Sequence, residues 1–377
     1  MIQSPGLLLT ILAFVLVVGP LVFLHEFGHY LAGRLFGVKA DTFSIGFGNE
    51  IAGFTDRRGT RWKVGWLPIG GYVKFAGDMS AAGLTDPAWL MLPPEERAHT
   101  FQAKPVWQRA IIVAAGPLTN FLVAIVILAG FAMAYGVSRT PTTAGQIMPG
   151  SAAAKAGIQA GDRIVALSGR RMETFDDLVF YVTVRAGEPV TVTLERGGRT
   201  LTCQATIGSD VVRDRFGNTM TRGLLGIAPT APVLAPVSLW KAPGVAIDRT
   251  GMIIRMTVET LGQVIRGERS VKQLQGPIGM AKASGEQLSL GMDAFVGLIA
   301  LVSINLGFIN LLPVPMLDGG HLFFYVIEAI RRRPVTPEIQ EWAFRGGLAA
   351  LLALMMLVTF NDIGALGVWD KLAGLIG

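Results

Sequence analysis

Long runs of apolar residues, separated by polar stretches, are the dominant pattern of this chain. A helix needs about 20 mostly apolar residues to cross the hydrocarbon core of a bilayer. Four segments supply such runs, namely residues 1–36, 110–136, 293–331 and 346–369. The pattern therefore predicts a polytopic α-helical membrane protein with about four transmembrane helices.

The first apolar segment could be mistaken for a cleaved signal peptide. It has no basic start and no small-residue cleavage site, and polar residues follow it directly. We expect it to be retained as a transmembrane helix. The composition agrees, because 51% hydrophobic residues, 16% charged residues and a mean hydropathy of +0.49 are too apolar for an ordinary soluble enzyme.

The regions between the apolar segments differ from one another. Residues 37–109 contain β-branched and aromatic residues punctuated by glycine and proline, which predicts short hairpins, although a plain cytoplasmic loop remains an alternative. Residues 143–229 have the composition of a soluble α+β domain, with a Ser-capped short helix, an amphipathic helix from Thr174 and a hairpin around Gly197. Residues 231–292 predict amphipathic helices that lie at the membrane interface.

The basic residues indicate which loops are cytoplasmic, because Lys and Arg in short loops mark that side. They surround the connection between the first two apolar segments and follow the third; these residues are Arg34, Lys39, Lys104, Arg109, Arg331, Arg332 and Arg333. The N-terminus, residues 137–290 and the C-terminus are then expected on the opposite side. The net charge of +6 is otherwise spread thinly, without a basic run interleaved with aromatic residues, so we expect no nucleic-acid partner.

Two histidines and a glutamate lie at the end of the first apolar segment, in the sequence HEFGH. His25 and His29 are four residues apart and share one face of a helix, so both imidazoles can bind one metal while Glu26 lies beside the open position. Zinc lowers the pKa of a bound water to about 7, and a neighbouring carboxylate can accept its proton. A simple polar helix end is the weaker alternative, because ionisable groups within a span cost several kcal/mol.

A catalytic zinc site needs a third protein ligand. The best candidate is Asp318, in the apolar stretch NLLPVPMLDGGHLFF, although it could instead cap the following helix and His321 could be the ligand. Pro313 and Pro315 both disfavour helix, so the third span is expected to be interrupted at residues 312–316. Broken backbone at membrane depth is tolerated where it lines a cavity in the protein.

Three motifs together resemble the site-2 protease family of intramembrane zinc metalloproteases. They are HEFGH, GPLTN at residues 116–120, and NLLPVPMLDG at residues 310–319. Their order and the inserted domain resemble most closely the bacterial RseP-type group with a single PDZ domain. The resemblance implies that one Zn²⁺ per chain is bound by His25, His29 and Asp318, and that Glu26 is the general base.

The same resemblance implies roles for further residues. Asn310, Asn120, Pro313 and Pro315 would position the substrate, although Asn120 could equally pack helices beside Gly116. Residues 37–109 would contain a membrane-reentrant β element whose open strand edge pairs with an extended substrate. Residues 143–229 would form a circularly permuted PDZ domain, and its groove would include Leu225, Gly226 and Ile227.

The expected function is regulated intramembrane proteolysis in the bacterial inner membrane, with lipid around the protein. The substrates would be single-pass membrane proteins, such as an anti-sigma factor already trimmed on its extracytoplasmic side. Two other classes compete with this prediction. A catalytically silent PDZ scaffold would have no use for Glu26, and a metal transporter would show repeated halves, which the sequence lacks.

Overall fold

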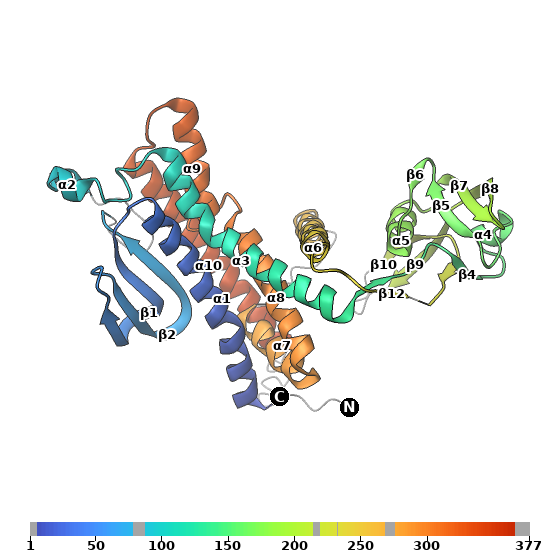
Figure 1. Cartoon of the computed structure of the whole chain (residues 1–377), viewed down its shortest axis with the longest axis horizontal. Helices are drawn as coiled ribbons and strands as arrows, with labels where there is room; N and C mark the ends of the chain where they lie inside the picture. The colour runs from blue at the N-terminus through green and yellow to red at the C-terminus, as the bar shows by residue number, and fades with distance from the viewer. Residues whose placement is uncertain (1–5, 78–86, 214–218, 232, 268–275, 366–377) are drawn as a thin grey trace, which may run out of the picture. The chain divides into compact units, whose positions relative to one another are not determined.

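The computed structural model describes residues 6–77, 87–213, 219–231, 233–267 and 276–365 (Figure 1). The chain forms two compact units. The first consists of Met1–Gly130 and Pro243–Gly377, and the second is the intervening segment Phe131–Ala242. The inserted unit therefore interrupts the first unit in sequence, and its bounds enclose residues 143–229, for which the sequence predicts a separate domain.

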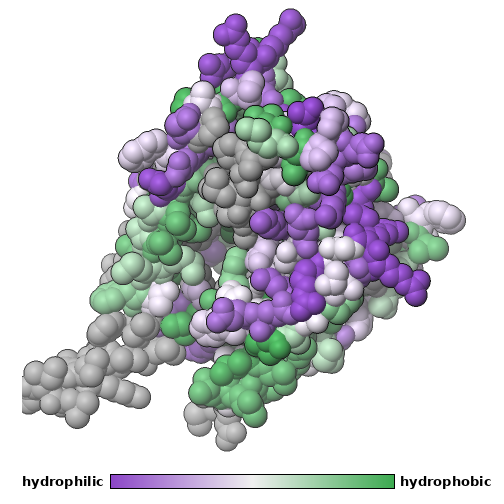
Figure 2. Space-filling model, turned by 90° about the vertical axis from the view of Figure 1, so that its left-hand side faces the viewer, coloured by the Kyte–Doolittle hydropathy of each residue, from purple (hydrophilic) through white to green (hydrophobic). Residues whose placement is uncertain are grey.

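Four helices of the described chain are long and apolar enough to cross a membrane. They are α1 (Leu7–Leu35), α3 (Val106–Tyr135), α8 (Met292–Asn310) and α10 (Pro337–Ala365). Only 17–28% of the most apolar stretch of each helix is buried within the protein, so most of its apolar side chains need a non-aqueous environment. On the face shown in Figure 2, hydrophobic side chains gather at the lower end and hydrophilic ones cover the upper part. These features support a multi-pass membrane protein.

The third apolar segment is interrupted in the region that the two prolines indicated. Helix α8 ends at Asn310, and the short helix α9 (Asp318–Arg331) follows after a break. Proline removes a backbone donor and disfavours helix before it, which accounts for the break. Within it, Met316 has a φ of 80°, an uncommon conformation for a residue other than glycine.

Residues 37–77 form one long bent hairpin rather than several short ones. Strand β1 (Ala40–Thr55) pairs antiparallel with β2 (Arg61–Phe75), and Ile45 lies opposite both Val64 and Gly71. Both strands bend, so that residues 42–45 of β1 pair with residues 61–64 of β2 on one side and with residues 71–74 of β2 on the other. Residues 71–75 consequently form an edge of this sheet. The sheet packs against α1 and α3 through a cluster of buried residues that includes Tyr30, Val38, Phe43, Phe75 and Ile112.

Two more helices follow the inserted unit, α6 (Ala242–Ile265) and α7 (Pro277–Leu290). The first turn of α7 is capped from another helix, because Asp362 of α10 accepts hydrogen bonds from the backbone N–H groups of Gly276 and Gly279 at 3.2 and 2.9 Å. Leu288 of α7 also packs against the apolar cluster around Val17 of α1. Helix α7 is thus packed into the bundle, whereas the sequence indicated a helix lying at the interface.

The second unit contains short paired strands and two short helices. A four-stranded sheet has the order β6-β5-β7-β8. Its strands are Arg170–Arg171, Arg163–Leu167, Pro189–Arg196 and Arg199–Thr206. Three further pairs join β3 (Val137–Arg139) to β12 (Val233–Ala235), β4 (Ala144–Ile147) to β11 (Ile227–Pro229) and β9 (Gly208–Arg213) to β10 (Thr219–Leu224). The hairpin around Gly197 corresponds to β7 and β8.

Local sequence signals account for the helices of the second unit. Ser151 caps α4 (Ala152–Lys155) by accepting a hydrogen bond from the Ala154 N–H at 3.2 Å. Thr174 and Asp177 form a capping box at the start of α5 (Phe175–Thr183). The remaining described helical turns, Pro87–Met91 and α2 (Pro94–Arg97), belong to the connection before α3 in the first unit.

An ion pair between a buried aspartate and a partly exposed arginine joins β7 to the residue before β5 in the second unit. The Asp162 carboxylate is 1% exposed and accepts hydrogen bonds from Nε and Nη2 of Arg196, each at 2.7 Å. The guanidinium therefore holds the pKa of the Asp162 carboxyl below its usual range.

Candidate active site

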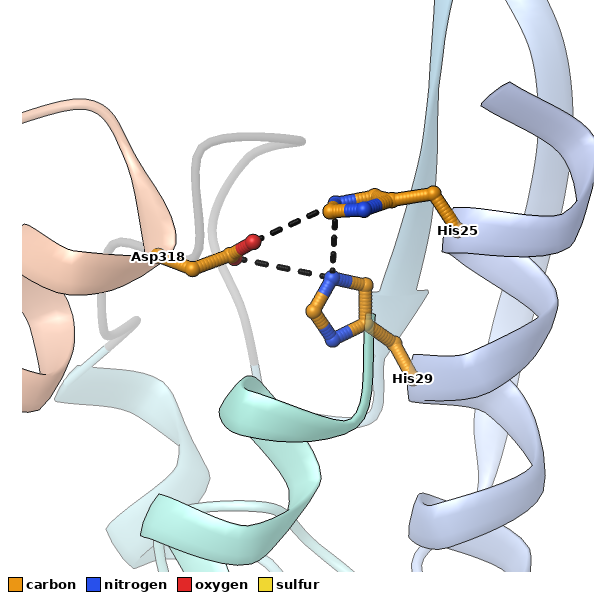
Figure 3. Close-up of side chains that lie close together, drawn as sticks. All are labelled: His25, His29 and Asp318. Carbon is orange, nitrogen blue, oxygen red and sulfur yellow. Dashed lines mark hydrogen bonds and ion pairs between the residues drawn. The ribbon is translucent and has the colours of Figure 1, made fainter. Parts of the chain in front are cut away.

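His25, His29 and Asp318 converge at one point (Figure 3). The Nε2 atom of His25 lies 3.2 Å from Asp318 Oδ2, and Nε2 of His29 lies 3.5 Å from Asp318 Oδ1. The two Nε2 atoms are 3.2 Å apart. The histidines come from α1 and the aspartate from the start of α9, so the cluster joins elements from opposite ends of the chain.

Local structure explains why these three side chains meet. Histidines four residues apart on α1 project from the same face of the helix. Asp318 follows the break after α8 and is the first residue of α9, and the N-cap position belongs to Leu317. The Asp318 carboxylate is therefore in the first turn of α9, where a negative charge is favourable, and it also faces the two histidines. His321 lies near the cluster with its ring centroid 4.9 Å from that of Phe344.

The two histidines are also contacted from α3. The Nδ1 atom of His29 lies 2.9 Å from the backbone oxygen of Ile112, to which it can donate. Nδ2 of Asn120 lies 3.0 Å from Nδ1 of His25. Gly116 lies so close to His29 that a Cβ at this position would collide with Nε2. The GPLTN stretch is thus in contact with both histidines, a contact that the sequence did not reveal.

A cavity of about 430 Å³ opens beside the cluster. Its walls include the three clustered residues together with Val22, Glu26, Tyr72, Asn310, Met316 and Tyr325. Glu26 is half-buried on α1, and its carboxylate interacts with the backbone N–H of Val73 on the edge segment of β2. Glu26 therefore lies between the clustered ligands and a strand edge. Pro313 and Pro315 lie in the break and are not among the cavity-lining residues.

The residues predicted for a PDZ groove lie in the second unit. Leu225 is buried, and its carbonyl accepts a hydrogen bond from the Ala153 N–H at 2.8 Å. Gly226 has a φ of 80°, and its carbonyl accepts from the Met148 N–H at 2.9 Å. Ile227 begins β11. These residues lead from β10 into β11 and are tied to α4 and to the residue that follows β4.

The donor set of the cluster fits a zinc ion. Two imidazole nitrogens and one carboxylate oxygen lie within 4.8 Å of one another. A catalytic zinc takes three ligands from the protein, so the number of donors agrees. The outer nitrogen of each histidine faces a polar group of α3, so both Nε2 atoms are directed to the common centre.

Comparison with known families identifies the chain. A model of peptidase family M50 matches residues 13–354. The chain belongs to this family. M50 peptidases, the family of the site-2 proteases, are zinc-dependent, so zinc is the metal that the cluster of His25, His29 and Asp318 fits.

Named relatives of this M50 peptidase match it over nearly its whole length. A protein named "Putative zinc metalloprotease Atu1380" from Agrobacterium fabrum is 44% identical, and the alignment covers 94% of this chain and 96% of that protein. Metalloprotease MmpA from Caulobacter vibrioides is 35% identical over 98% of this chain and 99% of its own. Among solved structures, a PDZ domain of an SdrC-like protein from Listeria monocytogenes is 17% identical over 25% of this chain and 92% of its own, with a TM-score of 0.20.

Proposed function

We propose that this M50 metalloprotease is a membrane-embedded endopeptidase that cleaves single-pass membrane proteins. The observation that carries the proposal is the convergence of Asp318 with His25 and His29, which lie next to Glu26 on a helix apolar enough to span a bilayer. Ionisable groups within a span are expensive and are kept where they serve a function. Proteolysis gives each of the four residues a role.

Zinc bound by the two histidines and Asp318 supplies a Lewis acid for hydrolysis. The Glu26 carboxylate lies on the cavity wall, where it can accept a proton from water and return it to the departing amine. The neighbouring Val73 N–H restrains the carboxylate, and the apolar parts of the cavity wall limit the access of bulk water. This arrangement fits amide hydrolysis, in which one group must move a proton twice.

The edge of β2 provides a way to hold the substrate. Residues 71–75 pair with β1 on one side, and the segment lies along the cavity at Gly71, Tyr72 and Val73. An extended peptide can add to such an edge through backbone hydrogen bonds, without a requirement for particular side chains. Asn310 lines the same cavity and is placed to contact a bound peptide backbone. We assign the hairpin to a reentrant position at the membrane surface, because Ile51 and Trp66 are 69% and 61% exposed.

The biological setting that we propose is regulated intramembrane proteolysis in the bacterial inner membrane. The basic residues around the first loop support a cytoplasmic position for the zinc site and an extracytoplasmic position for residues 137–290. The substrate would be a single-pass protein, such as an anti-sigma factor, after a first cleavage has removed its extracytoplasmic part. The second unit would act as a PDZ domain that limits access to substrates already trimmed.

The proposal is tested with the full chain purified in detergent, by measuring zinc content and cleavage of a trimmed single-pass protein. Glu26→Gln is expected to keep zinc, because the amide has nearly the same shape, and to lower turnover at least about 10²-fold. Asp318→Asn is expected to lose both zinc and activity, because it removes the anionic ligand. His321→Ala is the matched control near the cluster and should keep its zinc.

Three results would contradict the proposal. Cleavage at the wild-type rate by Glu26→Gln would show that Glu26 is not the general base. Loss of zinc in His321→Ala but not in Asp318→Asn would show that His321, and not Asp318, is the third ligand. Zinc binding without any proteolysis in the wild-type chain would favour a scaffold or a transporter.

A further inference from the structure

The side chain of Asn120 has no part in the chemistry proposed so far. It is fully buried on α3, 0% exposed. Its Nδ2 atom faces His25 Nδ1 at 3.0 Å, while its Oδ1 atom is buried with no hydrogen-bond partner among the residues that the structure describes. Buried polar atoms of native proteins are nearly always paired, so the unpaired oxygen calls for an explanation.

The direction of the hydrogen bond to His25 supplies that explanation. Nε2 of His25 is the nitrogen that faces Asp318 and His29. A neutral imidazole has one N–H group, and a nitrogen that gives its lone pair to a metal cannot carry the hydrogen. With Nε2 on a metal, Nδ1 therefore carries the hydrogen and needs an acceptor, which an amide NH₂ group is not.

Rotation of the Asn120 amide by half a turn satisfies this requirement. The oxygen and nitrogen of an amide are so similar in shape that their assignment follows from the hydrogen-bond network. The rotation directs Oδ1, the atom without a partner, at Nδ1–H of His25. The rotation thus gives the unpaired Oδ1 of Asn120 a hydrogen-bond donor and gives Nδ1–H of His25 an acceptor.

We propose that Asn120 is a positioning residue for the metal ligand His25. Its Oδ1 accepts the Nδ1–H hydrogen bond, which fixes the tautomer and the ring orientation that direct Nε2 to zinc. The inference rests on the proposed zinc site, and it places Asn120 behind the ligand rather than against the substrate. His29 has the corresponding arrangement with the backbone oxygen of Ile112 at 2.9 Å.

A third helix holds Asn120 itself in place. Ser303 of α8 is fully buried, and its hydroxyl donates to the backbone oxygen of Asn120 at 2.7 Å. This contact fixes the backbone of α3 at the residue that faces His25. The orientation of the ligand therefore depends on the packing of α1, α3 and α8, and the GPLTN motif contributes through Asn120 as well as Gly116.

The test compares Asn120→Leu with Asn120→Asp in the full chain purified in detergent, with Thr119→Ala as a control on the same helix. Zinc affinity is measured by competition with a chelator, and the visible spectrum of the cobalt-substituted protein reports the ligand geometry. Asn120→Leu is expected to weaken zinc binding about 10- to 100-fold and to change the cobalt spectrum. Asn120→Asp retains an acceptor oxygen and should bind zinc within about tenfold of wild type. Thr119→Ala should match wild type.

The substrate measurement separates a positioning role from direct contact. With saturating zinc, KM for a trimmed substrate should be unchanged in Asn120→Asp. A raised KM with unchanged zinc affinity would overturn the inference by placing Asn120 on the substrate. Weaker zinc binding in Asn120→Asp than in Asn120→Leu would also overturn it, because simple helix packing tolerates a buried leucine better than a buried charge. A wild-type chain that binds neither zinc nor cobalt would overturn the proposed function as well, whereas normal binding in Asn120→Leu would overturn this inference alone.

Discussion

Gly116 is a residue at which an added side chain would disturb the cluster of His25, His29 and Asp318. A Cβ at this position would collide with Nε2 of His29, the atom directed at the centre of the cluster. Small residues let transmembrane helices approach closely, and here the close approach leaves space for a metal ligand.

We expect Gly116→Ala to reduce zinc content and activity strongly, because the methyl group occupies the space of the His29 ring. The matched control is Gly130→Ala on the same helix, where a Cβ would meet no atom within 4 Å. Metal analysis of the two purified variants checks the prediction. Equal zinc content in both variants would show that the ring of His29 can move aside.

The sequence predicted the site unevenly at the residue scale. His25, Glu26 and His29 follow from a spacing that any helix converts into a shared face, and Asp318 from being a carboxylate in an apolar segment. The roles of Ile112 and Asn120 could not be predicted, because they depend on which side of α3 faces α1. The face of α3 that meets α1 is decided by packing between helices. A helix that is apolar all round has no periodic pattern that would indicate this face.

Strand β2 is the element that brings the backbone of the sheet to Glu26. At Gly71, a Cβ would lie 2.8 Å from the Ser44 oxygen, 3.0 Å from Cγ1 of Val22 and 3.1 Å from Cγ of Glu26. The absence of a side chain therefore lets the strand edge lie directly against α1 at Glu26.

We expect Gly71→Ala to lower turnover about tenfold or more, because the strand must move away from α1 and displacements of about 1 Å near a reacting centre can cost 10²-fold. Zinc content should not change, since none of the three atoms nearest to the added Cβ belongs to His25, His29 or Asp318. Peptide cleavage and metal analysis of one preparation measure both effects. Thr55→Ala, at the far end of β1, is the control, and equal turnover in both variants would contradict the role of the strand edge.

Elements with strong local signals were predicted best. The four long apolar helices, the break at the two prolines and the hairpin around Gly197 all have short-range causes in the sequence. The bend that places two parts of β2 on either side of β1 could not be foreseen, because strand pairing depends on contacts between residues distant in sequence. The packing of α7 against α1 was missed for the same reason.

At the scale of the whole molecule, the two units differ in the environment that stabilises them. The second unit has its own buried hydrophobic cluster and an ion pair between the buried Asp162 and the partly exposed Arg196. Because hydrogen bonds from Arg196 lower the pKa of Asp162, the pair contributes fully above the ordinary carboxyl pKa of about 4. That contribution is lost as the pH falls through the lowered pKa.

Asp162→Asn is therefore expected to destabilise the second unit by about 1–3 kcal/mol at neutral pH, and the difference from wild type should shrink below about pH 4. Hydrogen exchange of peptides from residues 163–206 measures this in the full chain. Asp210→Asn, which breaks the exposed pair with Arg222, is the control and should have a much smaller effect. A difference that stays constant as the pH falls would contradict the assignment.

The proposed gating role of the inserted unit is tested by replacing residues 143–229 with a short flexible linker. Zinc binding should be retained, because all three clustered residues lie in the first unit. If the unit excludes bulky substrates, the shortened enzyme should cleave both the full-length and the trimmed form of one substrate. If the shortened enzyme still fails to cleave the full-length substrate, selection between the two forms depends on the membrane-spanning unit.

The position of the three clustered residues along the chain has a consequence for biosynthesis. His25 and His29 lie before the inserted unit and the helix α8 in the chain, whereas Asp318 follows both. A chain that has not yet been synthesised as far as Asp318 therefore carries only two of the three clustered residues, and we expect it to bind zinc weakly. Zinc-dependent hydrolysis would then begin only after the later helices have been made.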